Sequence, residues 1–336
     1  MKRALAIVGV VAGAWMVVMI VRPETQAQSS PSLKQVATIT LPDVAGRIDH
    51  LGFDAPRRRL FIAALGNDTV EVLDTSRNAH LRSLPGFHEP QGIAVVSDLN
   101  GVAIANGDTG TLQLIDAETF QTRWTVAAGD DADNVRYDEQ TKRLYVAAVG
   151  GLYAFEPEKG GSAGRIAIPG HPESFQLELT GTRIFANLPG LVGSSIVASN
   201  RKTMTATETW STEVCGGNYP MALDEPTSRL FIGCRRSAKL ALFDTAAGKP
   251  VTSVPIVGDT DDLFYDVSRR RVYVIGGDGF VEIVGRNGDT LSAMGRVSTR
   301  AGARTGLWVA SLTRLYVAVP ARGGAPAEVR VFEAQG

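Results

Sequence analysis

The stretch DHLGFDAPRRRLFIAAL, residues 49–65, decides the fold because the chain repeats it. It reads as a short strand ending at Asp54, a polar turn, and a second strand that begins at Arg59 and continues with apolar residues. Clear copies are DNVRYDEQTKRLYVAAV (133–149), YPMALDEPTSRLFIGC (219–234) and DDLFYDVSRRRVYVIGG (261–277). Each copy has Asp, four residues, Arg and then an aromatic-rich apolar run.

Three weaker copies fill the gaps between the clear ones. They are PQGIAVVSDLNGVAIAN (90–106), PESFQLELTGTRIFANL (172–188) and TGLWVASLTRLYVAV (305–319). With Val96, Glu178 and Ala310 aligned to the acidic position, successive units lie 42, 42, 40, 46, 42 and 44 residues apart. Each unit continues into a third strand, such as VEVLDT, and a more variable fourth. This predicts an all-β protein, a single seven-bladed β-propeller with four-stranded antiparallel blades.

The ring should be closed by the N-terminal part of the mature chain. The seventh unit ends after its third strand, and LKQVATITL (33–41) reads as a fourth strand without a unit of its own. Pairing the two would complete the last blade and remove two exposed sheet edges.

The repeated Asp-x4-Arg-Leu/Val-Phe/Tyr-Val/Ile pattern and the VEVLDT-type strands resemble the secreted YVTN-repeat, or YncE-like, seven-bladed propeller proteins. The resemblance covers essentially all of the chain after the N-terminal segment. It implies the fold and leaves the function open, because such propellers serve as binders, scaffolds and enzymes, lactonase-like and lyase-like ones among them.

The N-terminus has the layout of an export signal. MKR precedes an apolar run of 18 residues, 4–21, and small residues follow near position 27. We expect a signal peptide at 1–27, a linker at 28–32 and the propeller at 33–336, located in the periplasm or outside the cell. A run of this length also fits a retained membrane anchor. Cys215 and Cys234 suit an oxidising compartment as a disulfide, although two free thiols or soft metal ligands fit as well.

Topology places the seven loops that lead into the first strands around one end of the central channel. We call them the mouth loops: GRIDH, FHEPQ, GDDADN, GHPES, CGGNYP, GDTDD and AGARTG. They are rich in carboxylates and contain three of the four histidines, so an acidic mouth is expected. The turns at the other end hold Arg57, Arg58, Lys142, Arg269 and Arg270, which predicts a basic face that is either plain solvated surface or turned toward anionic lipid headgroups.

The mouth residues allow several kinds of site. Carboxylates with imidazoles suit a divalent metal, with Ca, Mg, Mn, Zn and Cu not distinguished, whereas solvated loop acids and histidines bonded to neighbouring loops are the plainer interpretation. The candidate metal ligands are His50, Glu89, Asp133, His171, Glu173, Asp261 and Asp262. The candidate ligand-binding residues are Asp49, Glu89, Gln91, Asn134, Asn218, Tyr219 and Arg304, and His50 and His171 are the candidate general bases.

Three functions remain open at this stage. The first is a monomeric exported propeller that binds a small polar or cationic ligand at the mouth, with a divalent metal. The second is a metal-assisted lactone hydrolase or lyase, and the third a scaffold for other proteins. The acidic mouth and a formal net charge of −1 argue against nucleic acid. Neither a haem c attachment motif nor a nucleotide-binding fingerprint is present in the sequence.

Overall fold

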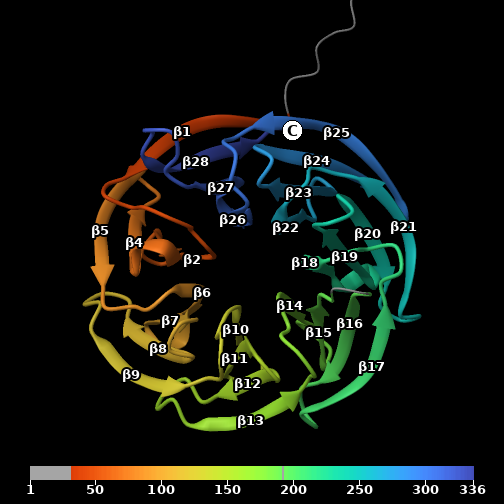
Figure 1. The fold of residues 1–336 in the computed structure, drawn as a ribbon, viewed down its shortest axis with the longest axis horizontal. Helices are drawn as coiled ribbons and strands as arrows, with labels where there is room; N and C mark the ends of the chain where they lie inside the picture. The colour runs from red at the N-terminus through yellow and green to blue at the C-terminus, as the bar shows by residue number, and fades with distance from the viewer. Residues whose placement is uncertain (1–31, 191–192) are drawn as a thin grey trace, which may run out of the picture. The chain divides into compact units, whose positions relative to one another are not determined.

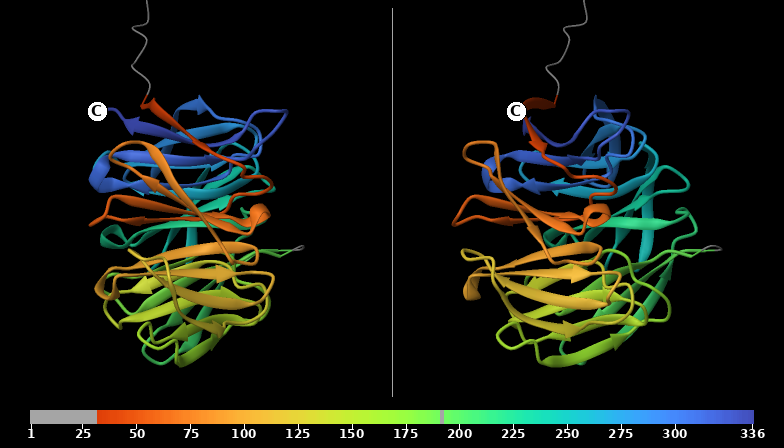
Figure 2. Two further views of the ribbon diagram at one scale, coloured as in Figure 1. Left: turned by 90° about the vertical axis from the view of Figure 1, so that its left-hand side faces the viewer. Right: turned by 60° about the vertical axis from the view of Figure 1, so that its left-hand side comes forward.

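The computed structural model describes residues 32–190 and 193–336, and these form seven four-stranded antiparallel sheets arranged as a ring (Figure 1). The predicted seven-bladed propeller is therefore confirmed. The first strands of the blades lie innermost, and the fourth strands form the outer wall (Figure 1); Figure 2 shows the same ring from the side. The predicted signal segment lies outside the described residues. Within the described part of the chain, no helix has the length and apolarity needed to span a bilayer.

The blades follow one another in chain order. Blade 1 contains β2 (Leu51–Asp54), β3 (Arg59–Ala64), β4 (Thr69–Asp74) and β5 (Ala79–Pro85). Blade 2 contains β6 (Pro90–Val96), β7 (Gly101–Asn106), β8 (Thr111–Asp116) and β9 (Thr122–Ala127). Blade 3 contains β10 (Val135–Asp138), β11 (Arg143–Ala148), β12 (Gly151–Phe155) and β13 (Ser162–Ala167). Blade 4 contains β14 (Phe175–Leu177), β15 (Arg183–Leu188), β16 (Ser195–Asn200) and β17 (Thr205–Ser211).

The remaining blades complete the circle. Blade 5 contains β18 (Asn218–Asp224), β19 (Arg229–Cys234), β20 (Lys239–Asp244) and β21 (Lys249–Pro255). Blade 6 contains β22 (Thr260–Asp266), β23 (Arg271–Gly276), β24 (Phe280–Asn287) and β25 (Thr290–Ser298). Blade 7 contains β26 (Thr305–Val309), β27 (Arg314–Val319), β28 (Ala327–Ala334) and, as its fourth strand, β1 (Leu33–Leu41). Strand β1 pairs antiparallel with β28 from Leu33↔Ala334 to Leu41↔Ala327, as the closing strand was predicted to do.

The hydrophobic core is divided among the seven blade-to-blade contacts. In β3, Leu60 and Ile62 pack toward blade 7, whereas Phe61 and Ala63 pack toward blade 2. Side chains of a strand alternate between its two faces, and here both faces are covered. The apolar run after the repeated arginine is thereby explained, because a second strand is buried on both sides.

The repeated motif is structural. Asp54, Asp138, Asp224 and Asp266 are all buried, and Asp54, for example, accepts a hydrogen bond from the Arg57 backbone in the turn that follows. The repeated arginines donate to a carbonyl just after the third strand of the next blade: Arg59 to Ala117, Arg183 to Thr245 and Arg271 to Gln335. These bonds link neighbouring blades at the end of the ring opposite the mouth.

The alignment of the seventh unit at Ala310 was wrong by one residue. Val309 pairs with Arg314 as Asp54 pairs with Arg59, so Val309 occupies the position of the repeated acid. The turn between the two strands is the short 3₁₀ helix η4 (Ala310–Leu312), and η2 (Ser97–Leu99) in blade 2 and η3 (Glu225–Thr227) in blade 5 are its counterparts, whereas η1 (Leu65–Asn67) lies between the second and third strands of blade 1. The Asp-x4-Arg spacing, counted back from Arg314, also indicates Val309.

The face opposite the mouth carries many ion pairs. Arg57 contacts Asp54 and Glu118, and Arg269 lies 3.1 Å from Asp266. Lys142 contacts Asp98. The arginines and lysine expected to make this face basic are thus partly neutralised. Arg57 and Arg269 pair with an acid three residues earlier in the same turn, and Arg57 and Lys142 also contact acids of the neighbouring blade.

Candidate functional site

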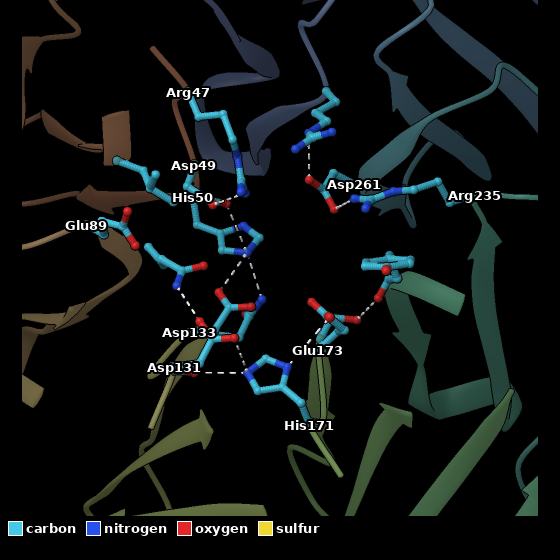
Figure 3. A pocket seen from close by; sticks show the side chains of 16 residues that line it. Arg47, Asp49, His50, Glu89, Asp131, Asp133, His171, Glu173, Arg235 and Asp261 are labelled. Atoms are coloured by element: carbon cyan, nitrogen blue, oxygen red, sulfur yellow. Dashed lines mark hydrogen bonds and ion pairs between the residues drawn. The ribbon is translucent and has the colours of Figure 1, made fainter. Parts of the chain in front are cut away.

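The mouth loops meet around a cavity of about 350 Å³ at one end of the channel (Figure 3). Its wall is almost entirely polar. It is lined by Arg47, Asp49, His50, Leu65, Glu89, Gln91, Asp131, Asp133, Asn134, His171, Glu173, Ser174, Tyr219, Arg235, Asp261 and Arg304. These residues come from all seven blades, which is the convergence that the topology predicts.

Three residues of the mouth loops adopt left-handed backbone conformations: Glu89, Asp131 and Asp259, with φ of 47°, 52° and 50°. The same conformation recurs in turns at the other end of the ring, at Arg58, Lys142 and Arg270 for example, so it does not single out the mouth. Gly92 allows blade 2 to approach blade 3, because a Cβ there would lie 2.2 Å from the carbonyl oxygen of Asp133. The close approach fixes Asp133 relative to its neighbours.

His50 lies at the floor of the cavity among three carboxylates. Its Nε2 is 3.6 Å from Asp49 and 3.8 Å from Asp133, and its Nδ1 is 3.5 Å from Asp262. Burial alone would lower the pKa of His50, but Asp262, Asp49 and Asp133 outweigh it and raise that pKa to about 10. An imidazolium surrounded by acids is the expected state at neutral pH.

The amide of Asn134 lies beside the His50 imidazole. Its Nδ2 is 2.8 Å from His50 Nε2, while its Oδ1 is buried without a hydrogen-bond partner among the described residues. A protonated histidine donates from both nitrogens, so turning the Asn134 amide by 180° would let Oδ1 accept a hydrogen bond from His50 Nε2.

Asp133 Oδ1 is likewise buried without a hydrogen-bond partner among the described residues. Burial raises the pKa of Asp133 well above its ordinary value, and Asp49 and Glu173 add to the effect against His50 and His171.

His171 forms a second, more open cluster. Its Nε2 lies 2.9 Å from the Asp131 carbonyl oxygen and 3.6 Å from the Asp131 carboxylate. Its Nδ1 lies 3.6 Å from Glu173. Burial would lower the pKa of His171, but Glu173, the Asp131 carbonyl and Asp133 raise it to about 9.

The other side of the mouth holds arginines with acids. Arg235 contacts Asp261 and stacks on Tyr219, with its guanidinium carbon 3.6 Å from the ring centre. Arg304 Nε lies 3.0 Å from Asp261, and both arginines also reach Asp259. Arg47 lies 2.9 Å from Asp49. We call these residues the arginine half: Arg47, Asp49, Tyr219, Arg235, Asp259, Asp261 and Arg304.

The remaining acids of the mouth lack such partners. Within residues 32–190 and 193–336, Glu89, Asp131, Asp133 and Glu173 have no lysine or arginine nitrogen within 4.0 Å. The basic side chains that approach them there are His50, near Asp133, and His171, near Asp131 and Glu173. Gln91 donates to Asp131 over 3.0 Å. We call these four acids the acidic half. They come from the loops of blades 2, 3 and 4.

Most residues predicted from the sequence line this one cavity, with two exceptions. Asp262 lies beneath it, where it faces His50 and accepts a hydrogen bond from the Gly306 backbone. Asn218 is fully buried and donates to Asn187 and Ser195, so it supports the wall from behind. Arg235 was missed, because its turn between β19 and β20 is remote in sequence from the acids that it neutralises. Asp131 was also absent from the chosen ligands.

Cys215 and Cys234 form a disulfide in blade 5. Cys215 lies in a mouth loop and Cys234 ends β19, one residue before Arg235. The bond thus ties the loop that carries Tyr219 to the strand that leads into Arg235. Both cysteines are buried.

Comparisons with known proteins support the fold alone. No protein-family model matches the chain, and no curated protein matches its sequence. A chain of hydrazine synthase from Kuenenia stuttgartiensis superposes with a TM-score of 0.72 at 15% identity, covering 82% of this chain and 93% of that one. A chain from a mitotic checkpoint complex gives 0.74 at 11%, covering 97% and 100%. One fold serves many functions, so neither likeness transfers a ligand.

Proposed function

We propose that this propeller binds a small organic cation at its mouth. One observation carries the proposal: four carboxylates line a single cavity, and none has a lysine or arginine partner within the described part of the chain. Like charges held together repel one another. An ammonium or guanidinium ligand would relieve that repulsion and form charge-assisted hydrogen bonds.

The two halves of the mouth give the ligand an orientation. In the arginine half each carboxylate already has a guanidinium, and the face of Tyr219 is already covered by Arg235. A cation therefore finds its partners at Asp131, Asp133 and Glu173. The raised pKa values of His50 and His171 keep both imidazoles protonated at neutral pH. A cationic ligand would therefore compete with His171 for Asp131 and Glu173.

Calorimetric titration with 1,4-diaminobutane tests the proposal, and 1,4-butanediol serves as the neutral control of similar shape. We expect saturable binding of the diamine and at least tenfold weaker binding of the diol. Glu173→Gln should lower the affinity for the diamine about tenfold, which corresponds to about 1.4 kcal/mol. Glu213→Gln is the matched control, because Glu213 is exposed and does not line the cavity.

Two results would count against the proposal. Equal affinities for diamine and diol would show that charge does not drive binding. An unchanged affinity in Glu173→Gln would show that the diamine binds elsewhere on the acidic surface.

A divalent metal at the mouth stays a prediction with less support. No group of three His, Cys, Asp or Glu side chains among the described residues is arranged to hold an ion. Both histidines have raised pKa values, whereas a metal ligand must be a neutral imidazole. The carboxylates that would remain, Glu89, Asp133 and Glu173, favour Ca²⁺ or Mg²⁺ over softer metals.

The lactonase or lyase alternative uses the same residues in another way. Its general base would be His50 or His171, and a base must be free of its proton at the working pH. With pKa values of about 10 and about 9, the two imidazoles are better suited to donate a proton than to take one.

Export through the 1–27 segment and membership of the YVTN-repeat, YncE-like group are proposed on the sequence patterns alone.

A further inference from the structure

A second cavity lies inside the ring, beneath the mouth. It measures about 350 Å³ and is bordered by the first strands of six blades. His50 lines both cavities. The wall of the lower cavity is mixed: its polar residues are His50, Arg136, Tyr137, Glu139, Gln176 and Asp262, and its apolar residues are Leu51, Ile93, Ala94, Val95, Val135, Phe264 and Leu307.

Among the residues that the structure describes, Arg136, on β10, is the only arginine or lysine that lines this lower cavity. Its Nη1 donates to the carbonyl of Val135 over 3.0 Å. No carboxylate oxygen of the described residues lies within 4.0 Å of its guanidinium, and Val135 is its only hydrogen-bond acceptor among them. A guanidinium has five N–H donors and stays charged at any ordinary pH. Most of its donors are therefore free to bind a ligand.

The acids around Arg136 are engaged elsewhere. Asp262 Oδ2 accepts a hydrogen bond of 2.9 Å from the Gly306 backbone and lies 3.5 Å from His50 Nδ1. Asp133 faces His50 from the mouth side. Glu139 borders the cavity but is exposed to solvent. None of the three supplies the close, paired oxygens that a guanidinium prefers.

We infer that the lower cavity is a second binding site, for a small apolar carboxylate whose two oxygens meet Arg136. A planar guanidinium binds a carboxylate through two parallel hydrogen bonds. The apolar wall formed by Ile93, Val95, Phe264 and Leu307 covers the hydrocarbon part. The ligand is opposite in charge to the one proposed for the mouth, and the site uses none of the acidic half.

Titration of the full-length protein with sodium hexanoate tests this site, with 1-hexanol as the uncharged probe. We expect saturable hexanoate binding and at least tenfold weaker hexanol binding. Arg136→Met should weaken hexanoate binding at least tenfold and leave hexanol binding unchanged. Arg165→Met is the matched control, because Arg165 is an exposed residue of β13 in the same blade and does not line the cavity.

Further variants keep the outcome decisive. Arg136→Lys keeps the charge but loses the paired geometry, so it should weaken hexanoate binding several-fold even where Arg136→Met folds poorly. Glu173→Gln should leave hexanoate binding unchanged, which separates this site from the mouth. Absence of saturable hexanoate binding, equal binding of hexanoate and hexanol, or full affinity in either folded Arg136 variant would overturn the inference.

Discussion

The two halves of the mouth both contain carboxylates and differ in what neutralises them. In the arginine half, Asp261 contacts Arg235 and lies 3.0 Å from Arg304. In the acidic half, the only basic side chain within ion-pair distance of Glu173 in the described part of the chain is His171, at 3.6 Å. The carboxylates of the arginine half form ion pairs within the chain, whereas the acidic half keeps negative charge that a cationic ligand would neutralise.

Backbone conformation does not separate the halves. Left-handed residues occur at Glu89 and Asp131 in the acidic half and at Asp259 in the arginine half. The difference lies in arginines contributed by other blades. An acidic loop is therefore open or closed to a cation according to its neighbours in space, and mutations that are chemically alike should act differently in the two halves.

Asp261→Asn should cause the largest change, because it breaks the network of the arginine half. The Asp261 side chain is 14% exposed, and removing one partner of a buried ion pair costs about 3–5 kcal/mol. Burial raises the pKa of Asp261 to about 6 against the two arginines, which offsets part of their attraction, and Asp259 remains to share them. We therefore expect a smaller loss, about 2 kcal/mol, in denaturant unfolding at pH 7. Asp131→Asn, the matched change in the other half, should cost less than about 0.5 kcal/mol. Equal losses of unfolding free energy in the two variants would contradict the distinction between the arginine half and the acidic half.

The pH dependence of stability should show whether His50 is protonated in the folded protein, where it lies near Asp49 of the arginine half and Asp133 of the acidic half. Its pKa is about 10 in the folded protein against 6.5 for the free side chain. The stabilisation is therefore complete below pH 6.5 and is lost as the pH rises toward 10. His50→Gln should melt below wild type, and the gap between the two should shrink over this range. A gap that stays constant would mean that His50 is not protonated.

Glu173→Gln should change the stability of the ligand-free protein only slightly. It removes repulsion from Asp133 and attraction to His171, so the two effects oppose each other. We expect a change within about 1 kcal/mol, measured by thermal unfolding without diamine. A loss above about 2 kcal/mol would show that Glu173 is already neutralised, as Asp261 is.

Glu89→Gln should have the smallest effect of the series. Glu89 is exposed at the rim, where water and salt screen its charge. We expect about a twofold loss of diamine affinity and no change in melting temperature. An effect as large as that of Glu173→Gln would extend the binding site to the rim of blade 2.

The fold was predictable because each repeat marks its own place in the ring. The Asp-x4-Arg motif fixed the hairpin of strands one and two, and the closing strand 33–41 has the same bounds in the structure. Topology then placed His50, Asp133 and His171 at one end of the channel. The error at Ala310 arose where the repeat lost its acid.

The charge balance of the site was not predictable in the same way. The sequence pattern predicts Asp261 as a metal ligand, but its carboxylate contacts Arg235 of blade 5 and Arg304 of blade 7. The proton on His50 depends on acids from three blades. Such pairings depend on side-chain positions across blade boundaries, and sequence spacing carries no information about them.

A crystal structure of the protein with 1,4-diaminobutane would test the central claim most directly. The account predicts an ammonium nitrogen within hydrogen-bond distance of Glu173 and of Asp131 or Asp133, with Asp261 still bound to Arg235 and Arg304. Diamine bound to Asp261 with its arginines displaced, or an acidic half without diamine at concentrations that saturate binding in solution, would contradict it.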